Sequence, residues 1–302
     1  MTRPTVRYAT PQAMRDAVIA HAKSTTAARP QASVDQLLRQ FADARLLARL
    51  FVLAPENWML KGATGLVVRL PSARHSLDVD LWGARDDLAE AEEEVGQAAA
   101  LDLGDHIDLD LGDWRRYPDG KRPLARTSVA CRIGRRPLVP PFGLDVVVGP
   151  PPPLPSDNAP PFEPFRIPDL PQPPLLRLYP ISCSVAEKLA ATMTLHHGFP
   201  SSRFRDLVDI ATIALTQRVA ARDLHIAISH ELREQGLTTP PGFAVPNPDA
   251  WQAGYTKQAQ RLPHLEGIGF EDAVALVKAF LDPALGGRRG GWWRPERRAW
   301  EP

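Results

Sequence analysis

The sequence contains little cysteine and no long apolar segment. Its two cysteines, Cys131 and Cys183, lie far apart in sequence, so they exclude a disulfide framework and show no metal-ligand spacing. No run of about 20 apolar residues is available to cross a bilayer, and the first residues lack the apolar core of a signal peptide. We therefore expect a cytoplasmic protein with no membrane partner.

Lysine is also scarce, because arginine supplies 30 of the 36 basic residues. The formal net charge is only +1, so any contact with nucleic acid requires a local basic patch and not a global field. Since arginine occupies most positions that need a positive charge, a lysine within a motif is stronger evidence for a specific role. With 302 residues, 44% of them hydrophobic, the chain suits one large or two modest globular domains.

Hydrophobic periodicity predicts an N-terminal α/β lobe followed by a helical lobe. Thirteen prolines between Pro150 and Pro180 forbid regular helix and central strand there, which predicts an extended crossover. The predicted domains are therefore 1–149, the proline-rich crossover 150–180, and the helical lobe 181–302. Helices are predicted at 11–28, 33–52, 86–100, 182–197, 201–217, 221–235 and 270–281, and strands at 57–60, 76–81, 106–111, 127–133 and 143–148.

Two aspartates alternate with apolar residues in the segment 76–81. In a strand, Asp78 and Asp80 would project from one face while Leu77, Val79 and Leu81 face the core. Asp145, within the predicted strand 143–148, is a candidate for a third carboxylate. Convergent carboxylates of this kind hold the two divalent ions that stabilise the attacking and leaving oxygens in nucleotidyl transfer.

A glycine-containing turn precedes this strand, and a second aspartate pair follows it. Lys61, Gly62, Ala63 and Thr64 form a predicted turn whose backbone amides and hydroxyl would cradle a triphosphate. Asp108 and Asp110 repeat the Asp-x-Asp spacing without a glycine turn before them, so we interpret that pair as structural. A single Asp-x-Asp usually marks a solvated strand face, and the order of the motifs therefore carries the prediction.

In that order the chain resembles the AbiEii and MenT nucleotidyltransferase toxins of bacterial toxin–antitoxin systems, over roughly residues 55 to 217. The family pattern is matched by residues 60–63, the strand 76–80, Asp145, the helical segment 187–189 and the segment 203–209. One departure is Ala63, which stands where the family has a second glycine. The phosphate turn is unaltered only if the backbone φ of Ala63 is negative.

The resemblance implies a polymerase-β-like fold, with a small mixed sheet carrying the carboxylates and a helical C-terminal lobe. It also implies that Asp78, Asp80 and Asp145 bind two Mg²⁺ ions, with Mn²⁺ as an alternative. Lys188 would face the triphosphate, and Asp209 would belong to the active site. Helical spacing leaves Asp206 as a scaffolding partner of Arg203 or Arg205. The alternative for Lys188 is a surface lysine.

The implied activity is transfer of a pyrimidine nucleotide, such as one from CTP, to the 3′ end of tRNA, under the control of a cognate antitoxin. Alternatives are a small-molecule or protein hydroxyl as acceptor, and an inactive homologue that only binds a partner. Ser76 resembles a position that an antitoxin phosphorylates, and its alternative role is to bond the turn at Gly62. The Arg/Trp-rich tail after residue 287 suits either RNA binding or docking on its own domain.

Overall fold

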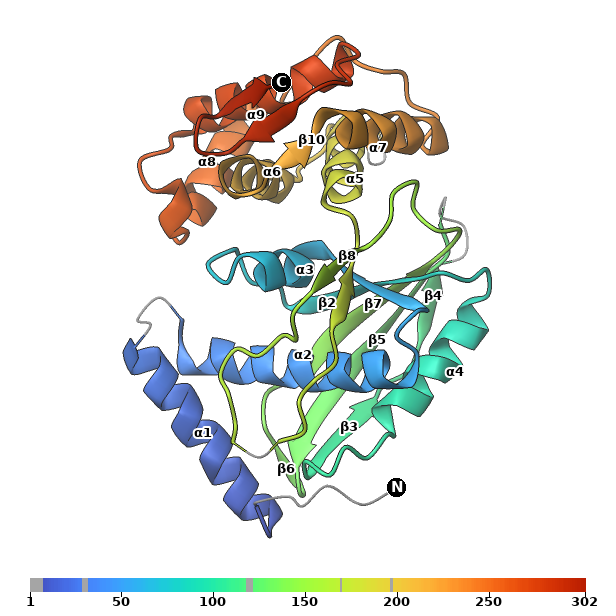
Figure 1. The fold of residues 1–302 in the computed structure, drawn as a ribbon, viewed down its shortest axis with the longest axis vertical. Helices are drawn as coiled ribbons and strands as arrows, with labels where there is room; N and C mark the ends of the chain where they lie inside the picture. Colours follow the sequence, from blue (N-terminus) through green and yellow to red (C-terminus); the bar gives the residue numbers. More distant parts are fainter. Residues whose placement is uncertain (1–7, 29–31, 118–121, 169, 196–197) are drawn as a thin grey trace. The chain divides into compact units, whose positions relative to one another are not determined.

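The computed structural model describes residues 8–28, 32–117, 122–168, 170–195 and 198–302 as two compact units (Figure 1). The first unit contains residues 1–64, 75–150 and 158–178, and the second contains residues 65–74, 151–157 and 179–302. The mixed α/β fold class is confirmed. No helix in the described part of the chain is long and apolar enough to span a membrane.

A nine-stranded mixed sheet forms the centre of the first unit. Its main path runs in the order β3-β5-β7-β2-β1-β9-β8, and β4 and β6 both pair with β5. Strand β7 is parallel to β2 and antiparallel to β5. The strands are β1 (Trp58–Lys61), β2 (Asp78–Gly83), β3 (Ile107–Leu111), β4 (Arg115–Tyr117), β5 (Leu124–Ile133), β6 (Arg136–Pro137), β7 (Phe142–Val148), β8 (Asp157–Ala159) and β9 (Leu176–Leu178).

Alternating side chains bury one face of these strands. Burial alternates regularly along β5 and β7, as expected for half-buried strands. Helix α4 contacts β3, β5 and β7, and it also contacts α2, which in turn contacts α1. The helices that begin in this unit are α1 (Pro11–Ala28), α2 (Val34–Leu53), α3 (Gly62–Arg69) and α4 (Leu88–Ala99).

Helix α2 is held by a capping box and by a buried ion network. Ser33 and Gln36 bond each other's backbone amides at its N-terminus, which satisfies two otherwise unpaired donors. Near its C-terminal end, Arg45 and Arg49 both bind Asp105, and all three side chains are almost completely buried. This buried cluster fixes the segment ahead of β3, because losing Asp105 would leave two buried cations without their carboxylate.

Two sequence predictions for the first unit are wrong in detail. The proline-rich segment is not wholly extended linker: its proline-free stretches form β8 and β9, and β9 lies between β1 and β8. The strand that carries the aspartates begins at Asp78 and not at Ser76. Leu77 therefore does not face the core and is 79% exposed.

The second unit is mainly helical and contains a small three-stranded sheet. Helix α5 ends at Met193, earlier than predicted, and His196 and His197 lie outside the described residues. Helix α8 was not predicted. The elements are α5 (Ile181–Met193), α6 (Phe204–Thr216), β10 (Val219–Ala220), α7 (Ala221–Glu234), α8 (Pro248–Ala259), η1 (Pro263–Leu265), α9 (Phe270–Leu285), β11 (Trp292–Arg294) and β12 (Ala299–Glu301).

The Arg/Trp-rich tail folds as a hairpin on its own unit. Strands β11 and β12 pair with each other, and β11 pairs with β10. Trp293 is fully buried, contacts Phe280 and Trp300, and donates a hydrogen bond from Nε1 to the Ala214 carbonyl at 2.6 Å. Of the two interpretations of the tail, docking is therefore correct for Trp293, which is not available to stack on RNA.

Candidate active site

Charged residues form a row across four adjacent strands of the first unit. Strand register places Asp145 of β7 beside Asp80 of β2, Arg126 of β5 beside Asp145, and Lys61 of β1 beside Asp80. From β5 to β1, the row therefore consists of a cation, two carboxylates and a second cation. Asp78 lies on the same face as Asp80, because residues two apart in a strand share a face. The structure thus brings the three predicted carboxylates to one region of the sheet.

Two glycines make room for the carboxylates of β2. A Cβ atom at Gly62 would lie 1.9 Å from Oδ2 of Asp80, and a Cβ atom at Gly143 would lie 2.0 Å from Oδ1 of Asp78. Real Cβ atoms do not approach other heavy atoms this closely. Each aspartate side chain therefore occupies space that only a glycine neighbour leaves open, and both glycines set the carboxylate positions.

Asp145 is engaged by Arg126. Its Oδ2 accepts a hydrogen bond from Nε of Arg126 at 2.9 Å, and Nη2 lies at 2.9 Å as well. Burial raises the pKa of Asp145 above its ordinary value, although Arg126 acts to lower it. Within the described ranges, no three His, Cys, Asp or Glu side chains are gathered into a preformed metal site. The hard oxygen donors nevertheless suit Mg²⁺ or Mn²⁺, provided that Asp145 exchanges its arginine partner for the ion.

The predicted phosphate turn is the N-terminus of helix α3. Gly62 has a φ of +65°, whereas Ala63 is not among the residues with positive φ. Alanine is therefore tolerated at position 63, and only Gly62 requires a glycine conformation. The Thr64 hydroxyl donates to the Asp78 carbonyl at 3.3 Å and so fixes the turn to β2.

Ser76 lies just ahead of strand β2. Its Oγ accepts a hydrogen bond from the Asp78 amide at 3.2 Å, which forms a local turn before the strand begins. The observed bond is thus to Asp78 and not the one predicted to Gly62. Ser76 is nevertheless two residues from the first carboxylate.

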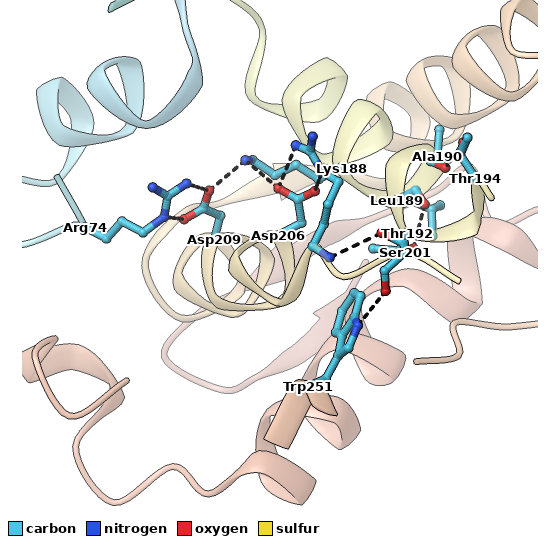
Figure 2. Close-up of polar contacts among 11 residues, drawn as sticks. Arg74, Lys188, Leu189, Ala190, Thr192, Thr194, Ser201, Asp206, Asp209 and Trp251 are labelled. Atoms are coloured by element: carbon cyan, nitrogen blue, oxygen red, sulfur yellow. Dashed lines mark hydrogen bonds and ion pairs between the residues drawn. The ribbon is translucent and has the colours of Figure 1, made fainter. Parts of the chain in front are cut away.

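The remaining predicted residues form an ion network within the second unit, in which Lys188, Asp206 and Asp209 are largely buried (Figure 2). Nζ of Lys188 lies 2.7 Å from Oδ2 of Asp209 and 3.4 Å from Oδ1 of Asp206. Arg74 binds both oxygens of Asp209, at 2.9 and 2.8 Å, in a bidentate pair. Arg203 binds Asp206 at 2.5 Å. Helices α5 and α6 therefore present Lys188 held by two acidic neighbours.

Electrostatics keeps Lys188 and Asp209 ionised. Burial acts to lower the pKa of Lys188, but the Asp209 and Asp206 carboxylates outweigh it, and the pKa lies above its ordinary value. Burial acts to raise the pKa of Asp209, but Lys188 and Arg74 outweigh it, and that pKa is lowered. Lys188 is consequently an ammonium ion suited to binding phosphate and unsuited to act as a general base. Its side chain is only 13% exposed, so it is not an ordinary surface lysine.

The competing aspartate pair occupies a different place in the sheet. Asp108 and Asp110 lie on β3, at the end of the main strand order and separated from β2 by β5 and β7. Asp110 forms an ion pair with Arg132 of the neighbouring strand. This placement favours the structural interpretation of the pair.

Three residues of the two clusters were not predicted. Arg126 and Gly143 contact the carboxylates of the first unit, and Arg74 binds Asp209 of the second. Arg74 stands four residues before Asp78, but its partner Asp209 lies 135 residues away in the sequence. Local sequence gives no signal for such pairs.

Replacing Gly143 with alanine should displace the Asp78 carboxylate while leaving the fold intact, because the clash is with the end of a partly exposed side chain. Misplacement by about 1 Å costs on the order of 10²-fold in rate. Steady-state NTP transfer measures this, with the melting temperature as the readout of folding. Gly96→Ala is the matched control, since a Cβ there meets nothing within 4 Å and α4 should gain stability. Full activity of Gly143→Ala would contradict the positioning role.

Comparisons with known proteins agree with this geometry. A family model described as the nucleotidyl transferase AbiEii toxin of a type IV toxin–antitoxin system matches residues 45–276. Because the match covers more than half of the sequence, the chain belongs to the AbiEii nucleotidyltransferase toxin family. No curated protein matches the sequence.

Solved structures resemble the chain as well. MenT4, a nucleotidyltransferase toxin from Mycobacterium tuberculosis H37Rv, is 20% identical with a TM-score of 0.51, over 87% of this chain and 99% of that one. A putative nucleotidyltransferase from H. pylori is 17% identical (TM-score 0.45, 83% and 97% covered), and JHP933 from Helicobacter pylori is 16% identical (TM-score 0.45, 82% and 92% covered). At this identity, the likeness to MenT4 shows a shared fold.

Proposed function

We propose that the chain is a metal-dependent nucleotidyltransferase that transfers a pyrimidine nucleotide, such as one from CTP, to the 3′ end of tRNA in the cytoplasm. The observation that carries the proposal is the row of Asp80 and Asp145 on adjacent parallel strands, with Asp78 on the same face of β2. Nucleotidyl transfer needs convergent carboxylates, and the family supplies the class of reaction.

Each group has a role in this reaction. Asp78, Asp80 and Asp145 would hold two Mg²⁺ ions, whose charge stabilises the attacking and leaving oxygens when they are bound. Lys61 and the amides of Gly62, Ala63 and Thr64 at the α3 N-terminus would bind the triphosphate. Lys188 would neutralise phosphate charge, while Asp209 and Arg74 hold its ammonium group in place. Asp206 in the first turn of α6 and Arg203 just before the helix support that arrangement.

The acceptor is tested by following label from NTP. The protein is incubated with each α-³²P-labelled NTP, Mg²⁺, and separate preparations of total RNA, protein and small metabolites. The proposal predicts label from CTP or UTP at tRNA 3′ ends, located by sequencing. Label in protein or in small molecules would support a different acceptor, and absence of label together with absence of NTP binding would support an inactive homologue.

Ser76 is proposed as a regulatory site that a cognate antitoxin controls by phosphorylation. A phosphate there adds nearly two negative charges two residues from Asp78, where the incoming NTP must place its own phosphates. We expect Ser76→Ala to keep most of its transfer activity and Ser76→Glu to lose about 10-fold or more. An electrostatic repulsion of about 1.4 kcal/mol is enough for a tenfold loss in rate. Both are compared in initial-rate assays of NTP transfer. Equal activity of the two variants would refute electrostatic control.

A further inference from the structure

An open basic groove runs along helix α7 in the second unit. It encloses about 480 Å³, and three sequence-distant segments line it: α7, the residue Arg289 after α9, and Pro153. The groove lies along one face of α7, because the lining residues of this helix recur at intervals of three and four. The lining residues are Pro153, Arg222, His225, Ile226, Ser229, His230, Arg233 and Arg289.

The ionisable residues that line the groove are all basic. Its lining holds three arginines and two histidines but no aspartate or glutamate. Among the described residues, no carboxylate forms an ion pair with Arg222, Arg233 or Arg289, whereas Arg294 and Arg297 of the same tail both bind Glu301. Exposed arginines that line one hollow with no carboxylate in its lining favour a polyanionic ligand.

The geometry of the groove suits an extended phosphodiester strand. Arg222 and Arg233 stand eleven residues apart on one helix, which is about 16 Å at 1.5 Å per residue. That distance accommodates more than one phosphate of a nucleic acid strand. Nη2 of Arg233 lies 3.3 Å from Nδ1 of His230, and this hydrogen bond orients the guanidinium group. A guanidinium group can bind a phosphate through two parallel hydrogen bonds.

The position of the groove connects it with the phosphate-binding lysine of the same unit. Helix α7 packs against α5, which carries Lys188. Imidazole rings and guanidinium planes add surfaces on which unpaired bases stack, and an acidic protein segment would not use these. Both features favour a nucleic acid strand over an acidic protein.

We propose that the α7 groove binds the sugar-phosphate backbone of the acceptor RNA through Arg222, Arg233 and Arg289. The lining of the groove includes neither the carboxylates nor Lys188. The identity of the strand as the acceptor rests on the proposed function, but strand binding itself is measured without transfer.

The test uses the full chain with Arg222→Gln, Arg233→Gln and Arg289→Gln combined. Binding of a fluorescent single-stranded RNA of about 12 nucleotides is followed by anisotropy without NTP or metal, over a range of salt concentrations. Lys257→Gln, Arg261→Gln and Lys278→Gln combined form the matched control, since these exposed residues of α8 and α9 and the turn between them remove the same charge outside the groove. Circular dichroism verifies folding of both variants.

We expect the groove variant to lose at least about 10-fold in affinity, and its slope of log K against log [salt] to fall by about 2, at ~0.7 per phosphate contact. The control variant should keep the affinity within about 2-fold. Equal losses in both variants, or none in the groove variant, would overturn the proposal. Displacement of the RNA by polyglutamate or by CTP at equal charge would also overturn it, in favour of an acidic protein or a free nucleotide. Transfer of label from NTP to RNA is assayed in parallel. A failure of the groove to bind RNA can therefore be distinguished from a failure of the protein to transfer nucleotides.

Discussion

Replacing Asp80 with asparagine is expected to abolish nucleotide transfer and to leave the protein folded. The substitution keeps the size of a side chain that lies against Gly62, and it removes one of two adjacent negative charges on β2 and β7. Without metal, the two carboxylates repel each other and destabilise the folded protein. Removing one of these charges should therefore not lower the free energy of unfolding. Loss of a metal-binding carboxylate costs several kcal/mol of transition-state stabilisation, which corresponds to on the order of 10³-fold in rate.

The measurement is Mg²⁺-dependent NTP transfer, with isothermal titration of Mn²⁺ as a second readout. Asp108→Asn is the control, because it repeats the change on strand β3, away from β2. Activity retained in Asp80→Asn would remove the basis of the proposed site. Activity lost in Asp108→Asn would show that the second aspartate pair is the functional one.

Replacing Asp209 with alanine is expected to destabilise the second unit strongly. Asp209 is 1% exposed, and it is the shared partner of Lys188 and Arg74. The alanine variant would leave two mostly buried cations facing each other with only Asp206 nearby. Removing one member of a buried ion pair costs about 3–5 kcal/mol, which we expect as the loss in free energy of unfolding.

Urea unfolding followed by circular dichroism measures this loss. Lys188→Met is the comparison, because Asp209 then keeps its bidentate partner Arg74 and the cost should be clearly smaller, while NTP binding should still be weakened. The pKa of Asp209 lies below its ordinary value of 3.8. The ionised carboxylate therefore makes its full contribution to the free energy of unfolding above pH 3.8, and this contribution is lost as the pH falls through the lowered pKa. Equal stability of the two variants at pH 7 would contradict the shared-anchor role.

The carboxylate strands could be predicted from sequence because their periodicity is local. Alternation of buried and exposed residues locates β2 and β7 within two residues, and it places Asp78 and Asp80 on one face. The parallel pairing of these strands is a property of the sheet, and it was not predicted from the sequence. The family and the fold class, both predicted, are confirmed.

Errors arise where a side chain forms a local turn or where the structure depends on contacts between distant residues. Leu77 fits an alternating pattern, yet the strand begins one residue later, because Ser76 bonds the Asp78 amide in a turn. Arg126 and Arg74 appear in sequence as two of many arginines, and their carboxylate partners are 19 and 135 residues away. Strand β9 depends on its pairing with β1, which no local propensity encodes.

The hairpin of β11 and β12 has a consequence for the order in which the chain folds during synthesis. Trp293 fills the space beside Phe280 and bonds the Ala214 carbonyl, so the core of α6 and α9 is incomplete without it. Translation from the end of α6 to β11 covers about 75 residues, which takes about 4 to 15 s at ~5–20 residues per second. The carboxylate strands leave the ribosome earlier still. A nascent chain therefore passes through a stage in which the carboxylate sheet is complete while the unit carrying Lys188 still exposes its apolar core.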